Sequence, residues 1–361
     1  MRFSIDREEF LEVLQKAKSA TEKRSALPVL NNFLLYAERG LLTVRATDLE
    51  NFLTFTIKAE ISAEGSLAVN ADKLTNVVKS IPSTTLYAEL KEGKLSLTGG
   101  RSKFNLTAID PEDFPEFPEI KLSAEIPASD LLKAIDKVEY AISKEDTRYA
   151  LQGMYVHQYK DRTHFVGSDG HRLALYYTQS SFPLELLIPR KSLKIIEKLL
   201  RDYVGELTAG RDESFAHIKG DYFSLSVRLL EGEYPDYLSV IPESFNSEVL
   251  IDRAEFLNSL KRLSAIAEGS AFPVKISLQD NLAIFEISEP EYGEGKDEME
   301  VDYTQEPIEL GFNGKYLIEA LESFDTDKVL LKIVDADTAV VIESEDPKED
   351  PYLCLIMPMR I

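Results

Sequence analysis

The sequence predicts an α+β fold in which one module occurs three times, each module carrying two helices on antiparallel sheets. Two observations predict this class. A short pattern, an apolar strand end followed by a polar break and an amphipathic helix, recurs six times in the 361 residues. Between these patterns, alternating stretches such as Leu53-Phe55-Ile57 are typical of half-buried antiparallel strands. Repeats at a fixed period indicate a copied structural unit.

The six copies form two series. Ile5, Ile126 and Ile251 mark the first series, at spacings of 121 and 125 residues. The second series begins at residues 69, 188 and 312, and the two copies within a module lie 61 to 64 residues apart. Aromatic-Pro-acid-aromatic segments at 114–117 and 234–237 end the first two modules, and the third lacks one. We therefore expect modules at 1–120, 121–246 and 247–361.

Composition narrows the class of protein. No apolar run is long enough to span a membrane, and the charged N-terminus does not resemble a signal peptide. The single cysteine, Cys354, cannot form an intrachain disulfide, so a reducing cytoplasm is the expected location. The net charge of −22 argues against a tight grip on nucleic acid, which needs Lys and Arg. An average charge does not show where the basic residues lie.

The segment from Pro189 to Tyr203 predicts a helix with one basic face. Its apolar residues, expected to face the sheet, are Leu193, Ile196, Leu200 and Tyr203, and its basic residues are Lys191, Lys194, Lys198 and Arg201. Weaker basic pairs on other repeat helices are Lys16 with Lys23, Lys73 with Lys79, Lys133 with Lys137, and Lys261 with Arg262. A solvated face is the simpler interpretation of any one helix. Recurrence at equivalent helices favours weak, sequence-independent contact with phosphates.

Geometry then predicts a dimer. Helices packed side by side lie about 10 Å apart, so a circle of six encloses a hole of roughly 9 Å and a circle of twelve about 28 Å. A DNA duplex is about 20 Å wide, judged from its groove depths. One chain supplies six repeat helices, so two chains are needed to encircle DNA if these helices line the hole.

Five motifs carry a resemblance to a known family. They are Arg24-Ser25-Ala26-Leu27-Pro28-Val29-Leu30, Ala46-Thr47-Asp48-Leu49-Glu50, Arg148-Tyr149-Ala150-Leu151-Gln152-Gly153-Met154, Ser168-Asp169-Gly170-His171-Arg172-Leu173-Ala174 and Met357-Pro358-Met359-Arg360-Ile361. Over essentially its whole length the chain resembles the beta subunit of bacterial DNA polymerase III, the replicative sliding clamp. The resemblance implies a non-catalytic, cofactor-free processivity factor, built as a head-to-tail homodimer of six clamp modules around duplex DNA. It also implies that a polymerase, a clamp loader and repair proteins dock through short peptide motifs.

The resemblance assigns three sets of residues. A partner-peptide groove between modules two and three is expected at Leu151, Ser168, Gly170, His171, Arg172, Leu173, Pro235, Val240, Leu355, Met357, Pro358, Met359 and Arg360. The dimer interface is expected at Lys103, Phe104, Leu106, Ile266, Glu298 and Glu300. Together with the basic helices, it predicts DNA contacts at Arg24, Lys73, Arg148, Tyr149, Lys194 and Lys198. Asp72, Glu145 and Ala150 depart from the family's DNA-contacting pattern, so the detailed contacts differ here.

Two other functions fit parts of the sequence. The chain could be an acidic scaffold that binds only peptides, without a basic inner surface. It could also be a hydrolase that uses His171 and Asp169, although a turn and a groove wall explain these residues more simply. The four histidines show no metal-ligand spacing and no phosphate-binding loop is present, so we expect neither a metal nor ATP. A buried final strand is the alternative for the Met-Pro-Met tail.

Overall fold

The computed structural model describes residues 1–22, 27–144, 147–269 and 271–360. They form two compact units. Unit 1 contains Met1–Ser129 and Lys191–Leu229, and unit 2 contains Asp130–Arg190 and the chain from Leu230 onward. Within the described residues no helix is long and apolar enough to cross a membrane.

The six predicted strand–helix pairs are all present. They are β1 (Arg2–Asp6) with α1 (Arg7–Ala17), β6 (Gly65–Asn70) with α2 (Ala71–Ser80), β10 (Ala124–Pro127) with α3 (Ala128–Val138), β14 (Leu186–Pro189) with α4 (Arg190–Leu200), β18 (Ser247–Asp252) with α5 (Arg253–Leu263), and β22 (Ile308–Asn313) with α6 (Gly314–Glu322). Each helix begins at the residue after its strand, because the polar break starts the helix. In four pairs the break is an Asp or Asn whose side chain accepts a backbone N–H of the first turn; these are Asp6, Asn70, Asp252 and Asn313.

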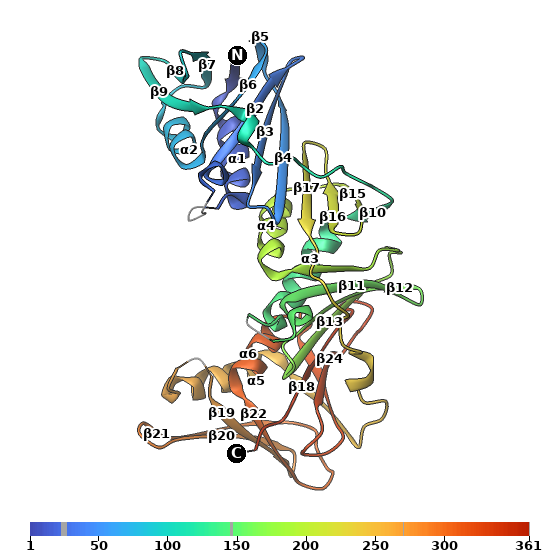
Figure 1. Ribbon diagram of the computed structural model, residues 1–361. Helices are drawn as coiled ribbons and strands as arrows, with labels where there is room; N and C mark the ends of the chain where they lie inside the picture. The colour runs from blue at the N-terminus through green and yellow to red at the C-terminus, as the bar shows by residue number, and fades with distance from the viewer. Residues whose placement is uncertain (23–26, 145–146, 270, 361) are drawn as a thin grey trace. The chain divides into compact units, whose positions relative to one another are not determined.

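Unit 1 contains one sheet of 13 strands, in the order β10-β15-β16-β17-β4-β3-β2-β6-β9-β8-β7-β1-β5 (Figure 1). The strands not yet given are β2 (Asn32–Glu38), β3 (Leu41–Thr47), β4 (Asn51–Lys58), β5 (Glu60–Ala63), β7 (Thr85–Lys91), β8 (Lys94–Gly99), β9 (Ser102–Ile109), β15 (Glu206–Arg211), β16 (Phe215–Lys219) and β17 (Phe223–Arg228). The sheet crosses a predicted module boundary where β4 pairs antiparallel with β17, with Leu53 opposite Leu225.

Unit 2 contains a sheet of 8 strands, in the order β14-β11-β12-β13-β25-β24-β23-β18, and a sheet of 4, in the order β21-β20-β19-β22. Their remaining strands are β11 (Gly153–Tyr159), β12 (Arg162–Ser168), β13 (Arg172–Thr178), β19 (Pro273–Gln279), β20 (Leu282–Glu289), β21 (Gly293–Glu300), β23 (Lys328–Ile333), β24 (Val340–Ser344) and β25 (Tyr352–Ile356). Here β13 pairs with β25, with Ala174 opposite Cys354, so this sheet also crosses a predicted module boundary.

The two compact units therefore follow the sheets and not the sequence repeat. The division falls inside the predicted second module, at residues 129–130, 190–191 and 229–230. Strand ladders at both module boundaries tie half of that module to each neighbour. The boundaries at 120 and 246 stay predictions.

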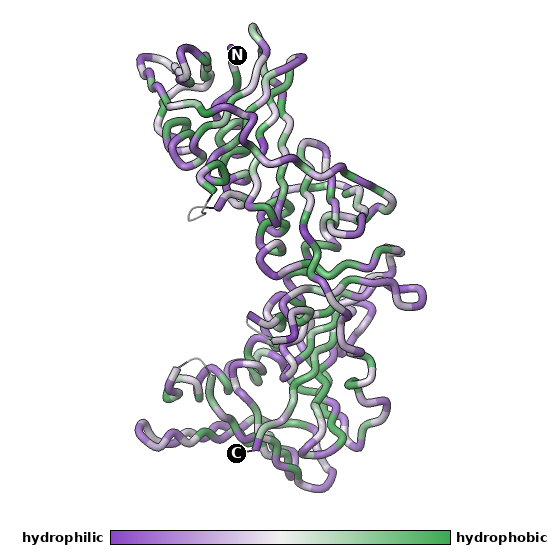
Figure 2. Tube along the Cα trace, viewed as in Figure 1, coloured by the Kyte–Doolittle hydropathy of each residue, from purple (hydrophilic) through white to green (hydrophobic). Residues whose placement is uncertain are grey.

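The core lies between the helices and the sheets. The predicted apolar face of α4 is buried, with Leu193, Ile196 and Leu200 at most 2% exposed, and Tyr203 after the helix is also buried. Figure 2 shows the apolar stretches concentrated in the strands and on the helices, and hydrophilic residues along most connecting loops. Burial of one face of each amphipathic element stabilises the fold through the hydrophobic effect.

Candidate peptide groove and basic helix surface

A cavity of about 170 Å³ lies on unit 2, where η5 (Tyr149–Gln152), β13, β25 and the segment 234–240 meet. Ten of the predicted groove residues line it: Leu151, Ser168, Gly170, His171, Arg172, Leu173, Pro235, Val240, Leu355 and Met357. Four further residues complete the lining: Arg148, Tyr234, Asp236 and Tyr237. Tyr234 and Tyr237 belong to the repeated aromatic-Pro-acid-aromatic segment, which was the sequence signal for them.

The floor of the groove is apolar. Leu173 and Leu355 lie opposite each other on β13 and β25, each 3% exposed, and pack with Leu151 and Val341 in one hydrophobic cluster. At the rim, Val240 is 51% exposed and Met357 43%. An apolar floor with an exposed Met at its edge suits short apolar anchors of varied shape.

The turn at residues 169–171 forms one wall. The Asp169 carboxylate accepts the backbone N–H groups of His171 at 2.9 Å and Arg172 at 3.0 Å. Gly170 has a φ of +84°, and a Cβ there would lie 2.4 Å from Nη2 of Arg148. Asp169 therefore shapes the turn, and the left-handed φ favours glycine at position 170, where a side chain would also shift the end of Arg148. This arrangement explains Asp169 and His171 without a catalytic role.

Arg172 lines the groove, but its polar atoms are used inside unit 2. Its Nε donates to Asp169 at 3.0 Å, Nη1 donates to Glu319 on α6, and Nη2 donates to the carbonyl of Tyr140 at 2.7 Å. The guanidinium also lies over the rings of Tyr140 and Tyr316. Burial opposes the charge, but the hydrogen bond with Glu319 raises the pKa of Arg172 above its usual value. Arg172 thus joins the groove to α6.

Arg148, predicted to contact DNA, lies in the groove lining beside Gly170. Its neighbour Tyr149 is 70% exposed, and Ala150 is buried. The sequence placed Arg148 and Tyr149 together because they are adjacent in one motif. Tyr149 is not part of the groove lining, so the two side chains have different surroundings, and their contact with DNA stays a prediction. Arg24 and Glu145 lie outside the described residues.

The C-terminal tail leaves the sheet at the groove. The ladder of β25 ends at Ile356, after which the N–H of Met357 donates to the carbonyl of His171 at 2.8 Å. The N–H of Met359 then donates to the carbonyl of Gly311 at 2.8 Å. Pro358, Met359 and Arg360 follow the groove lining along the chain and are not part of it. The final strand is buried, but the Met-Pro-Met tail is not a strand.

The basic face of α4 lies in unit 1, and its cations are exposed but largely paired. Lys191 forms ion pairs with Asp48 at 2.9 Å, Glu50 at 3.6 Å and Glu22 at 3.8 Å. Lys198 donates to the carbonyl of Gln15 at the end of α1, and Arg201 pairs with Glu197. Lys194 is the member of this face for which neither an ion pair nor a hydrogen bond of the side chain is found among the described residues. Contact with phosphates must therefore compete with internal partners.

Further cations gather next to α4. Burial, followed by the charges of Lys18 and Lys16, lowers the pKa of Lys198. Lys18 pairs with Asp72, which lies on α2 beside the exposed Lys73. The acid at position 72 therefore neutralises part of this surface, whereas the family pattern has a basic residue there. The partly neutralised surface around α4 therefore suits weak contact with phosphates.

The weaker basic pairs in unit 2 are not open basic surfaces. Lys137 is 3% exposed and forms an ion pair with the fully buried Asp350 at 2.8 Å, and Lys133 pairs with Asp325 at 3.0 Å. Lys261 pairs with Glu322 at 2.6 Å, and Arg262 pairs with Asp297. The expectation of a basic patch on α3 is wrong for Lys137, because its partner comes from a loop 213 residues away in the sequence.

Among the described residues, β9 and β21 each leave most of one edge unpaired. β9 pairs with β8 along its length but with β6 only at Ala108 and Ile109, and β21 pairs only with β20. The predicted interface residues on these strands are exposed or half-buried: Lys103, Phe104, Leu106, Glu298 and Glu300, as is Ile266 after α5. Phe104 is 38% exposed.

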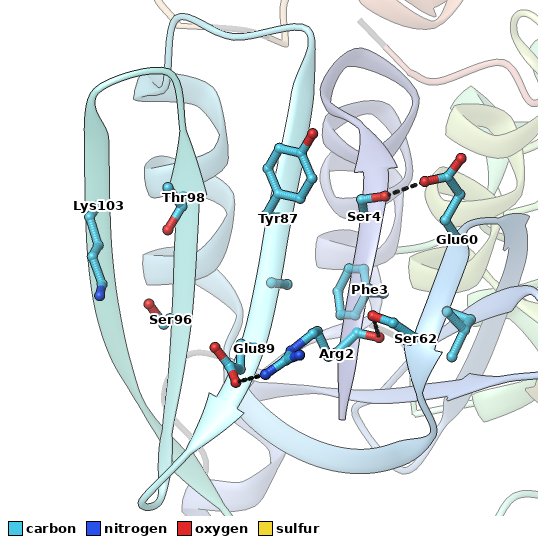
Figure 3. A pocket seen from close by; sticks show the side chains of 12 residues that line it. Arg2, Phe3, Ser4, Glu60, Ser62, Tyr87, Glu89, Ser96, Thr98 and Lys103 are labelled. Carbon is cyan, nitrogen blue, oxygen red and sulfur yellow. Dashed lines mark hydrogen bonds and ion pairs between the residues drawn. The ribbon is translucent and has the colours of Figure 1, made fainter.

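Beside β9 lies a second hollow of about 410 Å³, formed by β1, β5, β7, β8 and Lys103 of β9 (Figure 3). Figure 3 shows Tyr87 standing over it and an ion pair between Arg2 and Glu89. Most of the residues that line it are polar, and the charges of Arg2 and Glu89 neutralise each other. It offers neither an apolar floor nor a concentrated charge.

No catalytic or metal centre emerges from the described residues. They contain no group of three or more His, Cys, Asp or Glu side chains that could hold a metal ion. Cys354 is fully buried, and burial raises the pKa of its thiol to about 12, so it is not a reactive thiolate.

Three family models match the chain. They describe the N-terminal, central and C-terminal domains of the DNA polymerase III beta subunit and match residues 1–118, 125–236 and 238–360. The Beta sliding clamp of Pseudomonas aeruginosa is 30% identical and that of Vibrio cholerae 27% identical, each over the full length of both chains. The crystal structure of the Pseudomonas aeruginosa subunit superimposes with a TM-score of 0.94 at 29% identity, covering both chains completely. A Bartonella birtlesii sliding clamp bound to griselimycin gives a TM-score of 0.95 at 28% identity, again with complete coverage of both chains.

A three-module chain with this fold and these matches is a sliding clamp, a class of protein that tethers and does not catalyse. This chain belongs to the DNA polymerase III beta subunit family. It is a non-catalytic processivity subunit.

Proposed function

We propose that two copies of this chain close head to tail into a six-module ring around duplex DNA in the cytoplasm. The modules span 1–120, 121–246 and 247–361, and the groove on unit 2 holds short apolar peptides of a polymerase, a clamp loader and repair proteins. One observation carries the ring: β9 and β21, each largely unpaired along one edge, are the repeat equivalents of strands that pair at the internal module boundaries.

The repeat fixes this equivalence. In β8–β9 Leu97 lies opposite Phe104, and in β16–β17 Ile218 lies opposite Leu225, 121 residues later on both strands. In the three hairpins β3–β4, β12–β13 and β20–β21, the seventh residue of the first strand lies opposite Phe52, Leu173 and Glu294 respectively. The residues after these, Leu53, Ala174 and Gly295, are therefore equivalent.

Applying the register of the two internal boundaries to β9 and β21 gives the pairing expected between the subunits. Leu225 lies opposite Leu53 at the first internal boundary, and Cys354 lies opposite Ala174 at the second. The same register places Phe104 of one copy opposite Gly295 of the other. A Cβ on Gly295 would lie 3.2 Å from Ile266, so a Phe104 ring over this glycine contacts Ile266. Leu225 is fully buried, whereas Phe104 is 38% exposed, as expected of a strand that lacks its partner.

The register also brings opposite charges together. It places Arg101 opposite Glu298, at the position where Thr56 bonds to Tyr222 in the first internal boundary. Lys103 falls directly opposite Lys296, which has the same charge. The acids Glu294 and Glu298 lie diagonally on either side of Lys103. Cross-strand pairs of opposite charge stabilise a sheet by a few tenths of a kcal/mol up to about 1 kcal/mol each.

Solution mass tests this junction. The wild-type chain should sediment as a dimer of a 40.7 kDa protomer. Phe104→Asp should weaken the dimer at least about tenfold, since a buried aromatic anchor contributes on the order of 2 kcal/mol. The matched control is Tyr87→Asp, an exposed aromatic on a strand without a free edge, which should leave the dimer intact.

The register has its own test. Arg101→Glu should weaken the dimer, and adding Glu298→Arg to the same chain should restore it, because the reversed pair meets across both junctions. A wild-type monomer at micromolar concentration would overturn the ring. A dimer that Phe104→Asp leaves unchanged would place the junction elsewhere.

A further inference from the structure

Tyr237 fastens one wall of the groove to the sheet beneath it. Its ring is 5% exposed, and it lies just before η6 (Leu238–Val240). The Oη atom lies 2.8 Å from Nε2 of His157 on β11 and 2.7 Å from Nδ1 of His164 on β12. One hydroxyl thus bridges two histidines on neighbouring strands.

The chemistry of the bridge fixes its proton arrangement. A tyrosine hydroxyl donates one hydrogen and accepts others, and a neutral imidazole has one donor and one acceptor. Tyr237 therefore donates to one histidine and accepts an N–H from the other. One protonated ring can still be accommodated as a donor. Two protonated rings cannot be accommodated, because neither ring then offers an acceptor to the hydroxyl hydrogen of Tyr237. The two cations would also face each other with ring centroids 5.7 Å apart.

A second contact fastens the same wall. The ring of Tyr234 stacks on that of Tyr155 with centroids 4.8 Å apart, and Tyr155 stacks on His157 at 4.6 Å. Tyr234, Pro235, Asp236, Tyr237 and Val240 all line the groove. The position of this wall therefore depends on side chains of β11 and β12 that do not reach the groove themselves.

We propose that His157 and His164 are positioning residues for peptide binding: together they hold Tyr237, and through it the wall 234–240, at the width that an apolar anchor requires. This inference rests on the proposed function of the groove and adds two residues that lie outside its lining.

The surroundings of the two rings set the pH range. The titratable and charged groups that face them are Tyr159 on β11, Arg162 on β12, Tyr177 on β13, Tyr155 with Glu185, and Asp236 in the wall. Burial, followed by the charges of His157 and Arg162, lowers the pKa of His164 to about 4, and burial also lowers that of His157. Both depressions favour the neutral rings. The bridge therefore persists while at least one ring is neutral, and it is lost as the pH falls through the lowered pKa of the second ring, which is about 4 for His164.

Griselimycin, found in the related Bartonella birtlesii structure, is a suitable probe. We would titrate it calorimetrically into the full-length chain at pH 7.5, 5.5 and 4.0. Tyr237→Phe should weaken binding at pH 7.5 by about tenfold, since it removes both hydrogen bonds that hold the wall, and repacking of the wall recovers only part of that loss. His157→Leu and His164→Leu, made singly, should each weaken binding about threefold to fivefold.

Conservative variants separate positioning from general destabilisation. An amide can hydrogen-bond to Tyr237 but does not titrate, so the double variant His157→Gln with His164→Asn should restore most of the affinity and remove its fall between pH 7.5 and 4.0. Tyr303→Phe is the matched control: Tyr303 is equally buried in unit 2 and donates to the carbonyl of Glu306 at 2.6 Å, remote in sequence from the groove. It should leave griselimycin affinity unchanged.

The outcomes are distinguishable. If the wild-type chain does not bind griselimycin at pH 7.5, the groove itself fails, and this inference with it. If the wild type binds and the leucine variants bind equally well, or if the amide variant keeps the wild-type pH profile, the positioning role is overturned while the groove stands.

Discussion

Lys137 shows how far a single side chain can depart from its sequence pattern. Its spacing from Lys133 predicts an exposed basic pair, yet it is 3% exposed and buried against Asp350. Its Nζ also donates to the carbonyl of Ser323 at 2.6 Å, and Asp350 accepts the N–H of Asp325 at 2.9 Å. These contacts hold α3 to the loop before β25.

A double-mutant cycle tests this pair. Lys137→Met should lower the free energy of unfolding by about 3–5 kcal/mol, because it leaves the Asp350 carboxylate buried without its cation. Adding Asp350→Leu should recover most of this loss, since a well-packed apolar pair of similar volume is often as stable as a buried ion pair. Urea unfolding of both variants measures the difference. A loss below about 1 kcal/mol in the single variant would mean that the site admits water.

At the residue scale, the turn at 168–172 follows from a local motif. The leucines of the groove floor were expected from the family resemblance, carried over position by position, and they line the cavity. Lys137 was misplaced because its surroundings are set by Asp350, a residue far along the chain. Arg148 lines the groove beside Gly170, which the sequence did not indicate, and its contact with DNA stays a prediction.

At the scale of elements, the six strand–helix pairs were predictable because each is specified by about ten consecutive residues. An apolar strand end, a helix-capping Asp or Asn, and an amphipathic stripe are all local. The pairing of β4 with β17 was not predictable, since nothing local specifies which strand meets a distant edge. The same holds for β13 with β25.

The helices of unit 1 carry a prediction about DNA. Lys194 is exposed on α4, whereas Lys191, Lys198 and Arg201 have internal partners. Lys194→Glu should therefore weaken binding to a short linear duplex at 50 mM salt by about threefold to tenfold, in line with the loss of one or two phosphate contacts. Fluorescence anisotropy measures this. Lys94→Glu, at an exposed lysine that begins β8, serves as the control.

If both lysine variants bind DNA as tightly as the wild-type chain, the acidic scaffold is favoured over the clamp. The scaffold needs no basic helix surface and would bind peptides normally after either change. A fall in both variants would instead indicate a general response to charge, because the net charge is already −22.

At the scale of the whole molecule, a closed ring predicts a topological link with little contact energy. Chain loaded onto a closed circular plasmid should stay bound through gel filtration at 0.5 M salt, where contacts to phosphates are largely screened. Cutting the circle once should release it, since the ring slides off the free ends. Retention on the cut DNA at the same salt would exclude a topological link.

The strand ladders at the module boundaries have a consequence for synthesis of the chain. β4 ends at Lys58 and its neighbour β17 begins at Phe223, so more than 160 residues must be translated before the ladder can form. At roughly 5–20 residues per second, this leaves the nascent β4 edge open for about 10 to 30 seconds on the ribosome. The emerging first module is thus a partly finished sheet, and we expect it to depend on ribosome-associated chaperones until its second half arrives.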